Sequence, residues 1–203
     1  MFTVYAATPS PDDPLASLRT GDRPDPEVPD GSVAVTVRAA SPNMHDLWTL
    51  RGVGIAPERF PMILGCDGAG VLPDGSEVVI YPVVSSPDWI GDETLDPRRT
   101  LLTEKLQGSF ADTVVVPARN VLPKPAALTF PEAACMGTTW LTAYRMLFVK
   151  SGLRPGQTML VQGASGGVST ALVQLGRAAG MRVWVTGRTN EKQALACSLG
   201  AHQ

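Results

Sequence analysis

The sequence has few cysteines, no excess of positive charge and no long apolar run. Its three cysteines, Cys66, Cys135 and Cys197, are far apart and odd in number, which excludes a disulfide framework and fits a reducing cytoplasm. The formal net charge of −2 argues against nucleic acid or an anionic membrane surface as the main partner, because either usually requires a basic face. We therefore expect a cytoplasmic protein that binds neither.

Signals for export or membrane insertion are also missing. The opening stretch MFTVYAATPSPDDP soon turns polar, unlike a signal peptide, and no apolar run reaches the roughly 18 residues of a membrane span. What is present is a chain of 203 residues, 44% hydrophobic and 18% charged. That composition is typical of a soluble globular protein with one large or two modest domains.

Proline divides the chain into two parts, because 17 of its 18 prolines lie at or before Pro131. Proline is confined to turns, strand edges and helix starts, so the first part should consist of short strands and loops. Alternating or β-branched residues predict strands at residues 32–38, 77–80 and 113–116, and Pro-Asp-Gly at residues 73–75 predicts a tight turn.

Helical periodicity takes over after Pro131. Apolar residues at helical spacing, Trp140, Tyr144, Leu147 and Phe148, predict a helix with one buried face. Further on, the pattern predicts a strand at residues 158–162, a helix ending at Gly180, a strand at 182–186 and a helix at 190–199. Strand, helix, strand, helix with short connections indicates a parallel α/β sheet.

A glycine-rich turn, residues 163–169, joins the first of these strands to its helix. Backbone N–H groups at a helix start carry partial positive charge, and small residues let a pyrophosphate approach them. Against the dinucleotide pattern G-x-G-x-x-G only one glycine position is intact, but the strand-turn-helix context is right. The alternative is a small-residue turn that binds nothing. The candidate cofactor-binding residues of the turn are Ala164, Ser165, Gly166, Gly167 and Val168.

The end of the second strand indicates which nicotinamide cofactor binds. An NAD site usually places an Asp or Glu there on the ribose hydroxyls, whereas this chain has Gly187 and Arg188 and no carboxylate before Glu191. A cation without an acid suits a 2′-phosphate, so we expect NADPH, with Lys192 as a further contact. The alternative is that Arg188 is only a solvated loop residue.

Five blocks of sequence together resemble the medium-chain dehydrogenase/reductase superfamily over essentially the whole chain. They are VRAASPNMHDLWTLRG (37–52), GCDGAGV (65–71), GSFADTVVVP (108–117), LTAY (141–144) and LRPGQTMLVQGASGGVS (153–169). The resemblance implies an α/β protein with a GroES-like β-rich catalytic domain at residues 1–125. The first part of a Rossmann NADP-binding domain, a doubly wound parallel sheet, follows at 126–203. Family members continue further, so we expect either a piece of a longer enzyme or a decayed product.

Zinc members of that superfamily have three metal ligands, and the matching positions here are Asn43, Cys66 and Thr138. One thiol among three positions does not make a catalytic zinc site, which normally has three protein ligands. The cysteine-rich structural-zinc segment would fall near residues 85–106, which contain no cysteine. We therefore expect no metal, and Cys66 as a buried small hydrophobe.

Without a Lewis acid, hydride from NADPH must go to an acceptor that itself stabilises negative charge, such as a quinone or an α,β-unsaturated carbonyl. This matches the superfamily's quinone oxidoreductase branch, whose N-x-x-D pattern is present at Asn43 and Asp46. The resemblance implies that Asn43 contacts nicotinamide or acceptor and that Thr142 contacts the nicotinamide carboxamide. Asp46 would organise the loop. A purely helix-capping Asp46 and a solvent-facing Thr142 are the alternatives.

Trp48 is expected as a core aromatic, or else as a wall of the acceptor pocket. Three other readings of the whole chain stay open: an enoyl thioester reductase, a non-catalytic, crystallin-like NADPH-binding protein, and an inactive fragment. The superfamily resemblance further implies a homodimer if the protein is full length.

Overall fold

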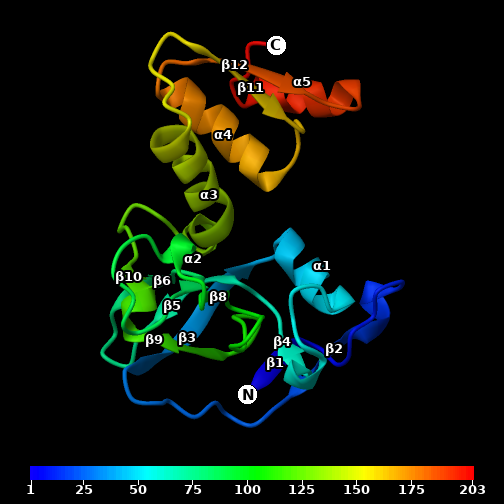
Figure 1. Ribbon diagram of the computed structural model, residues 1–203, viewed down its shortest axis with the longest axis vertical. Coiled ribbons are helices and arrows are strands. Elements are labelled where there is room, and N and C mark those ends of the chain that lie inside the picture. The colour runs from blue at the N-terminus through cyan, green and yellow to red at the C-terminus, as the bar shows by residue number, and fades with distance from the viewer. The chain divides into compact units, whose positions relative to one another are not determined.

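The computed structural model describes residues 1–203, which form two compact units, Met1–Thr138 and Thr139–Gln203. Figure 1 shows antiparallel strands in the first unit and a strand-helix alternation in the second. The predicted domain boundary at residues 125/126 follows the sequence resemblance. The packing boundary falls later because helix α2 (Phe130–Ala134) contacts the sheet of the first unit.

The first unit is built on a five-stranded antiparallel sheet in the order β10-β6-β5-β3-β9. Its strands are β3 (Ser32–Ser41), β5 (Asp67–Val71), β6 (Glu77–Ile80), β9 (Thr113–Pro117) and β10 (Val121–Pro123). The three strands predicted from the sequence are therefore present. The turn at residues 73–75 is also present, with Gly75 at a φ of 88° that favours glycine.

Two smaller sheets complete this unit. One has the order β2-β1-β4 and the other pairs β7 with β8. Their strands are β1 (Phe2–Ala6), β2 (Leu18–Asp22), β4 (Met62–Ile63), β7 (Val83–Val84) and β8 (Thr100–Leu101). Short 3₁₀ turns lie at Pro14–Ser17, Pro57–Arg59, Glu93–Leu95 and Ala118–Asn120. Helix α1 (Met44–Arg51) follows β3 directly.

Branched side chains alternate along these strands and form the core of the first unit. Val35, Val114 and Val116 lie in it with Ile80 and Leu102, each at most 2% exposed. Cys66 belongs to the same cluster and is 1% exposed, which confirms its prediction as a buried hydrophobe. Cys66 is the residue immediately before β5.

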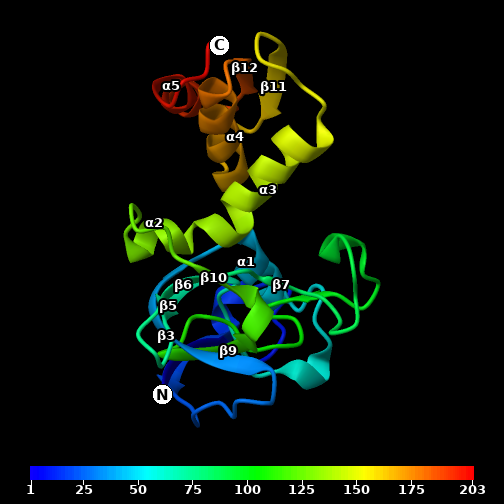
Figure 2. The same ribbon diagram turned by 90° about the vertical axis from the view of Figure 1, so that its left-hand side faces the viewer.

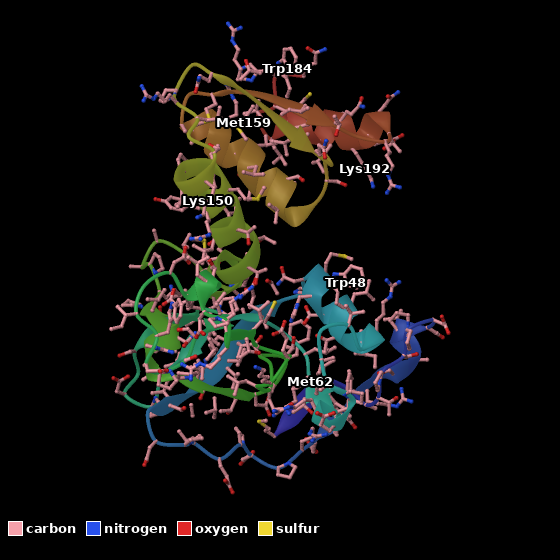
Figure 3. The ribbon with its side chains drawn as sticks, in the orientation of Figure 1. Trp48, Met62, Lys150, Met159, Trp184 and Lys192 are labelled. Atoms are coloured by element: carbon pink, nitrogen blue, oxygen red, sulfur yellow. The ribbon has the colours of Figure 1, made fainter.

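The second unit contains two parallel strands, β11 (Thr158–Gln162) and β12 (Arg182–Thr186). Helix α4 (Gly167–Ala178) packs on both strands and α5 (Asn190–Ser198) on β12 (Figure 2). Met159, Val161 and Val183 are buried on the helix-covered face. Leu160 and Trp184, opposite each other across the strand pair, are 60% and 47% exposed (Trp184 is labelled in Figure 3).

The predicted helix after Pro131 is present, but its turns are wider than those of a regular α-helix. Hydrogen bonding is of the π type at Met136–Trp140 and Arg145–Lys150, on either side of α3 (Leu141–Tyr144). Wider turns shift the apolar stripe. Ala143 and Leu147 are buried, whereas Tyr144 and Phe148 are about half exposed with their rings 4.9 Å apart, so the predicted burial of those two rings is wrong.

Candidate functional site

The glycine turn of the second unit lines an open pocket of about 480 Å³. Gly163 has a φ of 86°, which a residue with a Cβ rarely adopts, and it starts the turn immediately after β11. The carbonyl of Thr186, the last residue of β12, accepts hydrogen bonds from the amides of Gly163 and Ala164 at 3.1 and 2.8 Å. The strand ends therefore hold the turn against the loop that follows β12.

Most of the residues predicted to bind the cofactor meet in this pocket. Its lining is Gly163, Ala164, Ser165, Gly166, Ser169, Thr186, Gly187, Arg188 and Lys192. Gly167 and Val168 form the first turn of α4, where backbone amides have no acceptor within the helix. Thr142 is exposed on α3 and is not among the lining residues. Sequence reasoning missed Ser169 and Thr186.

Gly167 is required by a close approach within the second unit. A Cβ on Gly167 would lie 2.9 Å from Cγ2 of Thr139, closer than real Cβ contacts allow. The start of α4 thus packs directly against the helical segment that leads to Thr142. The glycine places the α4 amides beside the pocket rather than serving only to make the turn flexible.

The end of β12 carries two cations and little free space. Arg188 and Lys192 are exposed at the pocket (Lys192 is labelled in Figure 3). A Cβ on Gly187 would lie 2.9 Å from Cγ of Gln193 and 3.1 Å from Cβ of Ala164, so this glycine is also needed for close packing. The nearest downstream carboxylate, Glu191, does not line the pocket; a hydrogen bond from Thr189 lowers its pKa.

A second cluster of polar groups lies in the first unit, around the buried carboxylate of Asp67. Asp67 begins β5 and is 0% exposed. Its Oδ1 accepts a hydrogen bond from Thr138 Oγ1 at 2.6 Å, and its Oδ2 accepts from Asn43 Nδ2 at 3.0 Å and Ser41 Oγ at 3.3 Å. Burial raises the pKa of Asp67, and the bonds from Thr138 and Asn43 oppose that rise.

This cluster contains the three positions that match the zinc ligands in zinc members of the superfamily that the sequence resembles. Cys66 Sγ lies 3.4 Å from Thr138 Oγ1, and Asn43 reaches the same carboxylate as Thr138. Burial raises the pKa of the Cys66 thiol to about 12, so the thiol stays protonated. The donor set is one neutral thiol, one amide and one hydroxyl.

Asp46 lies nearby with both carboxylate oxygens occupied by backbone amides. Its Oδ2 accepts from the amide of Asn43 and its Oδ1 from the amide of Gly65, each at 2.7 Å. The first contact closes the start of α1, and the second ties that start to the turn before Cys66. Burial raises the pKa of Asp46, against the lowering effect of these bonds.

Two residues differ in importance from what the sequence indicated. Trp48 is 41% exposed, with the Arg51 guanidinium 5.5 Å from its ring centroid (Figure 3), so the expectation of a core aromatic is wrong. Asp67 was missed altogether. An aspartate among small residues at a strand start was the available signal, since strands are depleted in Asp.

The comparisons with known proteins agree with this architecture. Residues 29–126 match the alcohol dehydrogenase GroES-like domain family. The crotonyl-CoA carboxylase/reductase of Cereibacter sphaeroides is 34% identical over 197 residues, covering 87% of this chain and 46% of that protein. A solved NAD-dependent alcohol dehydrogenase superposes with a TM-score of 0.89 at 36% identity, over 100% of this chain and 62% of the other.

The chain belongs to the medium-chain dehydrogenase/reductase superfamily. Another solved member, the quinone oxidoreductase of Thermus thermophilus, studied also in complex with NADPH, is 31% identical with a TM-score of 0.74. The match covers 100% of this chain and 58% of the Thermus thermophilus protein. The chain spans about half the length of several curated superfamily relatives that it matches.

Two further findings concern the superfamily member as a whole. No three or more histidine, cysteine, aspartate or glutamate side chains lie together in a way that could hold a metal ion. None of its helices has the length and apolar character needed to cross a membrane.

Proposed function

We propose that this superfamily member is an NADPH-dependent oxidoreductase that transfers hydride to a quinone or an α,β-unsaturated carbonyl without zinc. The observation that carries the proposal is the pocket at the glycine turn. Arg188 and Lys192 line it and no carboxylate does, which suits the extra phosphate of NADPH and leaves no carboxylate to accept from a ribose diol.

Each part of the pocket has its own task in holding the dinucleotide. The free amides at the start of α4 face the pyrophosphate, where the helix dipole favours negative charge. Ala164, Ser165 and Gly166 allow the phosphates to approach the backbone. Arg188 donates paired hydrogen bonds to the 2′-phosphate, and Lys192 adds a point charge. Thr142, on α3 outside this pocket, would hydrogen-bond the nicotinamide carboxamide.

Zinc independence is supported by the chemistry of the first-unit cluster. A catalytic zinc site needs three good ligands, usually thiolate, imidazole or carboxylate. Asn43 and Thr138 supply an amide and a hydroxyl, so Cys66 is the single good ligand among the three positions. A substrate that depends on a Lewis acid is therefore a poor fit.

The acceptor must then stabilise the charge that develops when hydride arrives. Bound NADPH supplies the hydride, and one proton from water completes the reduction. The products are NADP⁺ and a hydroquinone or a saturated carbonyl. In the first unit, Asp46 organises the loop that presents Asn43.

Enoyl thioesters are the second candidate within the same acceptor class. The specific observation in their favour is the similarity to crotonyl-CoA reductases, at 34% and 30% identity. Crotonyl-CoA is an α,β-unsaturated thioester, so its reduction needs the same hydride donor and no metal.

Binding and turnover test the proposal separately. Binding of NADPH and of NADH is measured by fluorescence titration. Turnover is measured as NADPH oxidation by the full-length protein, with a benzoquinone or crotonyl-CoA as the acceptor. We expect tighter binding of NADPH and turnover with at least one acceptor. Equal affinity for NADH would overturn the cofactor assignment, and turnover of a simple alcohol alone would overturn the acceptor class.

A further inference from the structure

We propose that Asp67 is a positioning residue that locks the Asn43 carboxamide in one orientation, leaving only its Oδ1 acceptor to bind a ligand. Asn43 then recognises a hydrogen-bond donor. This inference rests on the proposed function only for its kinetic test.

The contacts of the Asn43 amide determine its orientation. Its Nδ2 lies 3.0 Å from Oδ2 of Asp67 and 3.3 Å from the backbone oxygen of Ser41. Both neighbours are acceptors, and Nδ2 has two protons to donate. Turning the amide over would set its Oδ1 against two oxygens, so the network excludes that arrangement. The Asp46 amide donates to the backbone oxygen of Asn43 at 3.0 Å, so the lone pairs of Oδ1 remain for a ligand.

Asp67 is held rigidly enough to act as the fixed point. Three donors, on Ser41, Asn43 and Thr138, converge on its side chain. Its backbone carbonyl accepts a further bond from Ser109 Oγ at 2.5 Å. A buried carboxylate is retained only with such partners, because an unpaired one is costly.

Gly137 allows the segment at residues 137–138 to approach the Asp67 carboxylate closely. A Cβ there would lie 2.7 Å from Asp67 Oδ1 and 2.9 Å from the backbone oxygen of Ile80. Any other residue would push the segment, and with it Thr138, away from Asp67. Segments 41–43, 66–67 and 137–138 therefore meet at a single acceptor group.

Two single variants test the lock. Asp67→Asn replaces one acceptor oxygen with a donor, so the network no longer fixes the Asn43 carboxamide in one orientation. Asn43→Asp places two carboxylates side by side and sets an oxygen against the backbone oxygen of Ser41. We expect each variant to lower the melting temperature.

The Asn43 side-chain amide gives a direct signature that does not depend on catalysis. In the unmodified protein its NH₂ protons are both donated, so NMR should show slow exchange with solvent. In Asp67→Asn that protection is lost. Asp96→Asn, a change at a buried carboxylate elsewhere in the same unit, is the matched control and should leave Asn43 protected.

Kinetics of the full-length protein test the identity of the ligand. Loss of one hydrogen bond corresponds to about a tenfold change in affinity. We expect Asp67→Asn to raise about tenfold the KM of the substrate that donates to Asn43, and to leave the other KM unchanged.

The outcomes separate this inference from the proposed function. Unprotected Asn43 protons in the unmodified protein, or unchanged protection in Asp67→Asn, would overturn the lock. A KM for NADPH and a KM for the acceptor that both stay unchanged in Asp67→Asn would overturn the ligand-binding role of Asn43. A full-length protein without turnover would overturn the proposed function, while the exchange and melting data would still decide the lock.

Discussion

Three buried aspartates of the first unit show how local partners decide the behaviour of one residue type. Burial acts to raise the pKa of each, because it disfavours the charged form. In Asp46 and Asp67 burial dominates and the pKa is raised. In Asp96, hydrogen bonds from Ser86 and the amide of Arg98 prevail and lower the pKa to about 2. Through these hydrogen bonds, Asp96 stabilises the segment at residues 85–106, which contains no cysteine.

Asp96 should make stability depend on pH on the acid side. A carboxyl whose pKa is lower in the folded state stabilises the fold above its unfolded pKa, and this contribution is lost as pH falls through the folded pKa. The window runs from the ordinary value of 3.8 down to about 2. Urea unfolding should show the advantage of the unmodified protein over Asp96→Asn shrinking in that window. Asp12→Asn, on the exposed surface, is the control; a pH-independent Asp96→Asn difference would contradict the assignment.

Arg188 is expected to discriminate between the two cofactors. A hydrogen bond to a charged group contributes about 1.5–3 kcal/mol, and exposure of Arg188 favours the lower end through screening. Arg188→Ala should therefore weaken NADPH binding about tenfold and leave NADH binding nearly unchanged, as measured by fluorescence titration. Arg182→Ala, at the opposite end of β12, should change neither. An equal loss for both cofactors would show that Arg188 does not contact the 2′-phosphate.

At the scale of elements, the close approach of α4 to the preceding helical segment positions the binding turn. Gly167→Ala should clash with Thr139 and lower the free energy of unfolding by about 1–3 kcal/mol, the usual cost of overpacking. It should also weaken NADPH binding, because the first α4 amides shift.

The companion change for Gly167→Ala is Thr139→Ser, which removes the methyl group that the new Cβ would meet and keeps the hydroxyl. Denaturant unfolding of the double variant should recover most of the lost stability. Gly166→Ala is the contrast, because its Cβ would have only an ordinary contact of 3.5 Å with Ser169. If Thr139→Ser gives no recovery, the close approach is not the reason for the glycine.

At the scale of the whole molecule, the chain should fold without metal. The amide of Asn43, the neutral thiol of Cys66 and the hydroxyl of Thr138 are weak zinc ligands. The 85–106 segment is held by side-chain hydrogen bonds instead of a metal. Dialysis against a strong chelator should leave the melting temperature unchanged. Elemental analysis that finds about one zinc per chain would refute this prediction, and a zinc alcohol dehydrogenase treated in parallel is the positive control.

Much of the second unit could be predicted from sequence because its signals are local. The order of β11, the glycine turn, α4, β12 and α5 follows from patterns among residues that are neighbours in the chain. The adjacent Gly187 and Arg188 were identified in the same way. Three strands of the first unit, β3, β6 and β9, followed for the same reason. Burial in the helical segment after Pro131 was predicted wrongly at Tyr144 and Phe148, since π-type turns break the regular period on which the prediction relied.

The sequence by itself determined the superfamily, the element order of the second unit and the cation at the end of β12. Only the tertiary structure brought Asn43 and Thr138 onto Asp67, from segments far apart in the chain. Only it showed that Gly137, Gly167 and Gly187 are needed for close packing. Hydrogen bonds and steric contacts act over a few ångströms in space, whatever the separation along the chain, so no local pattern records them.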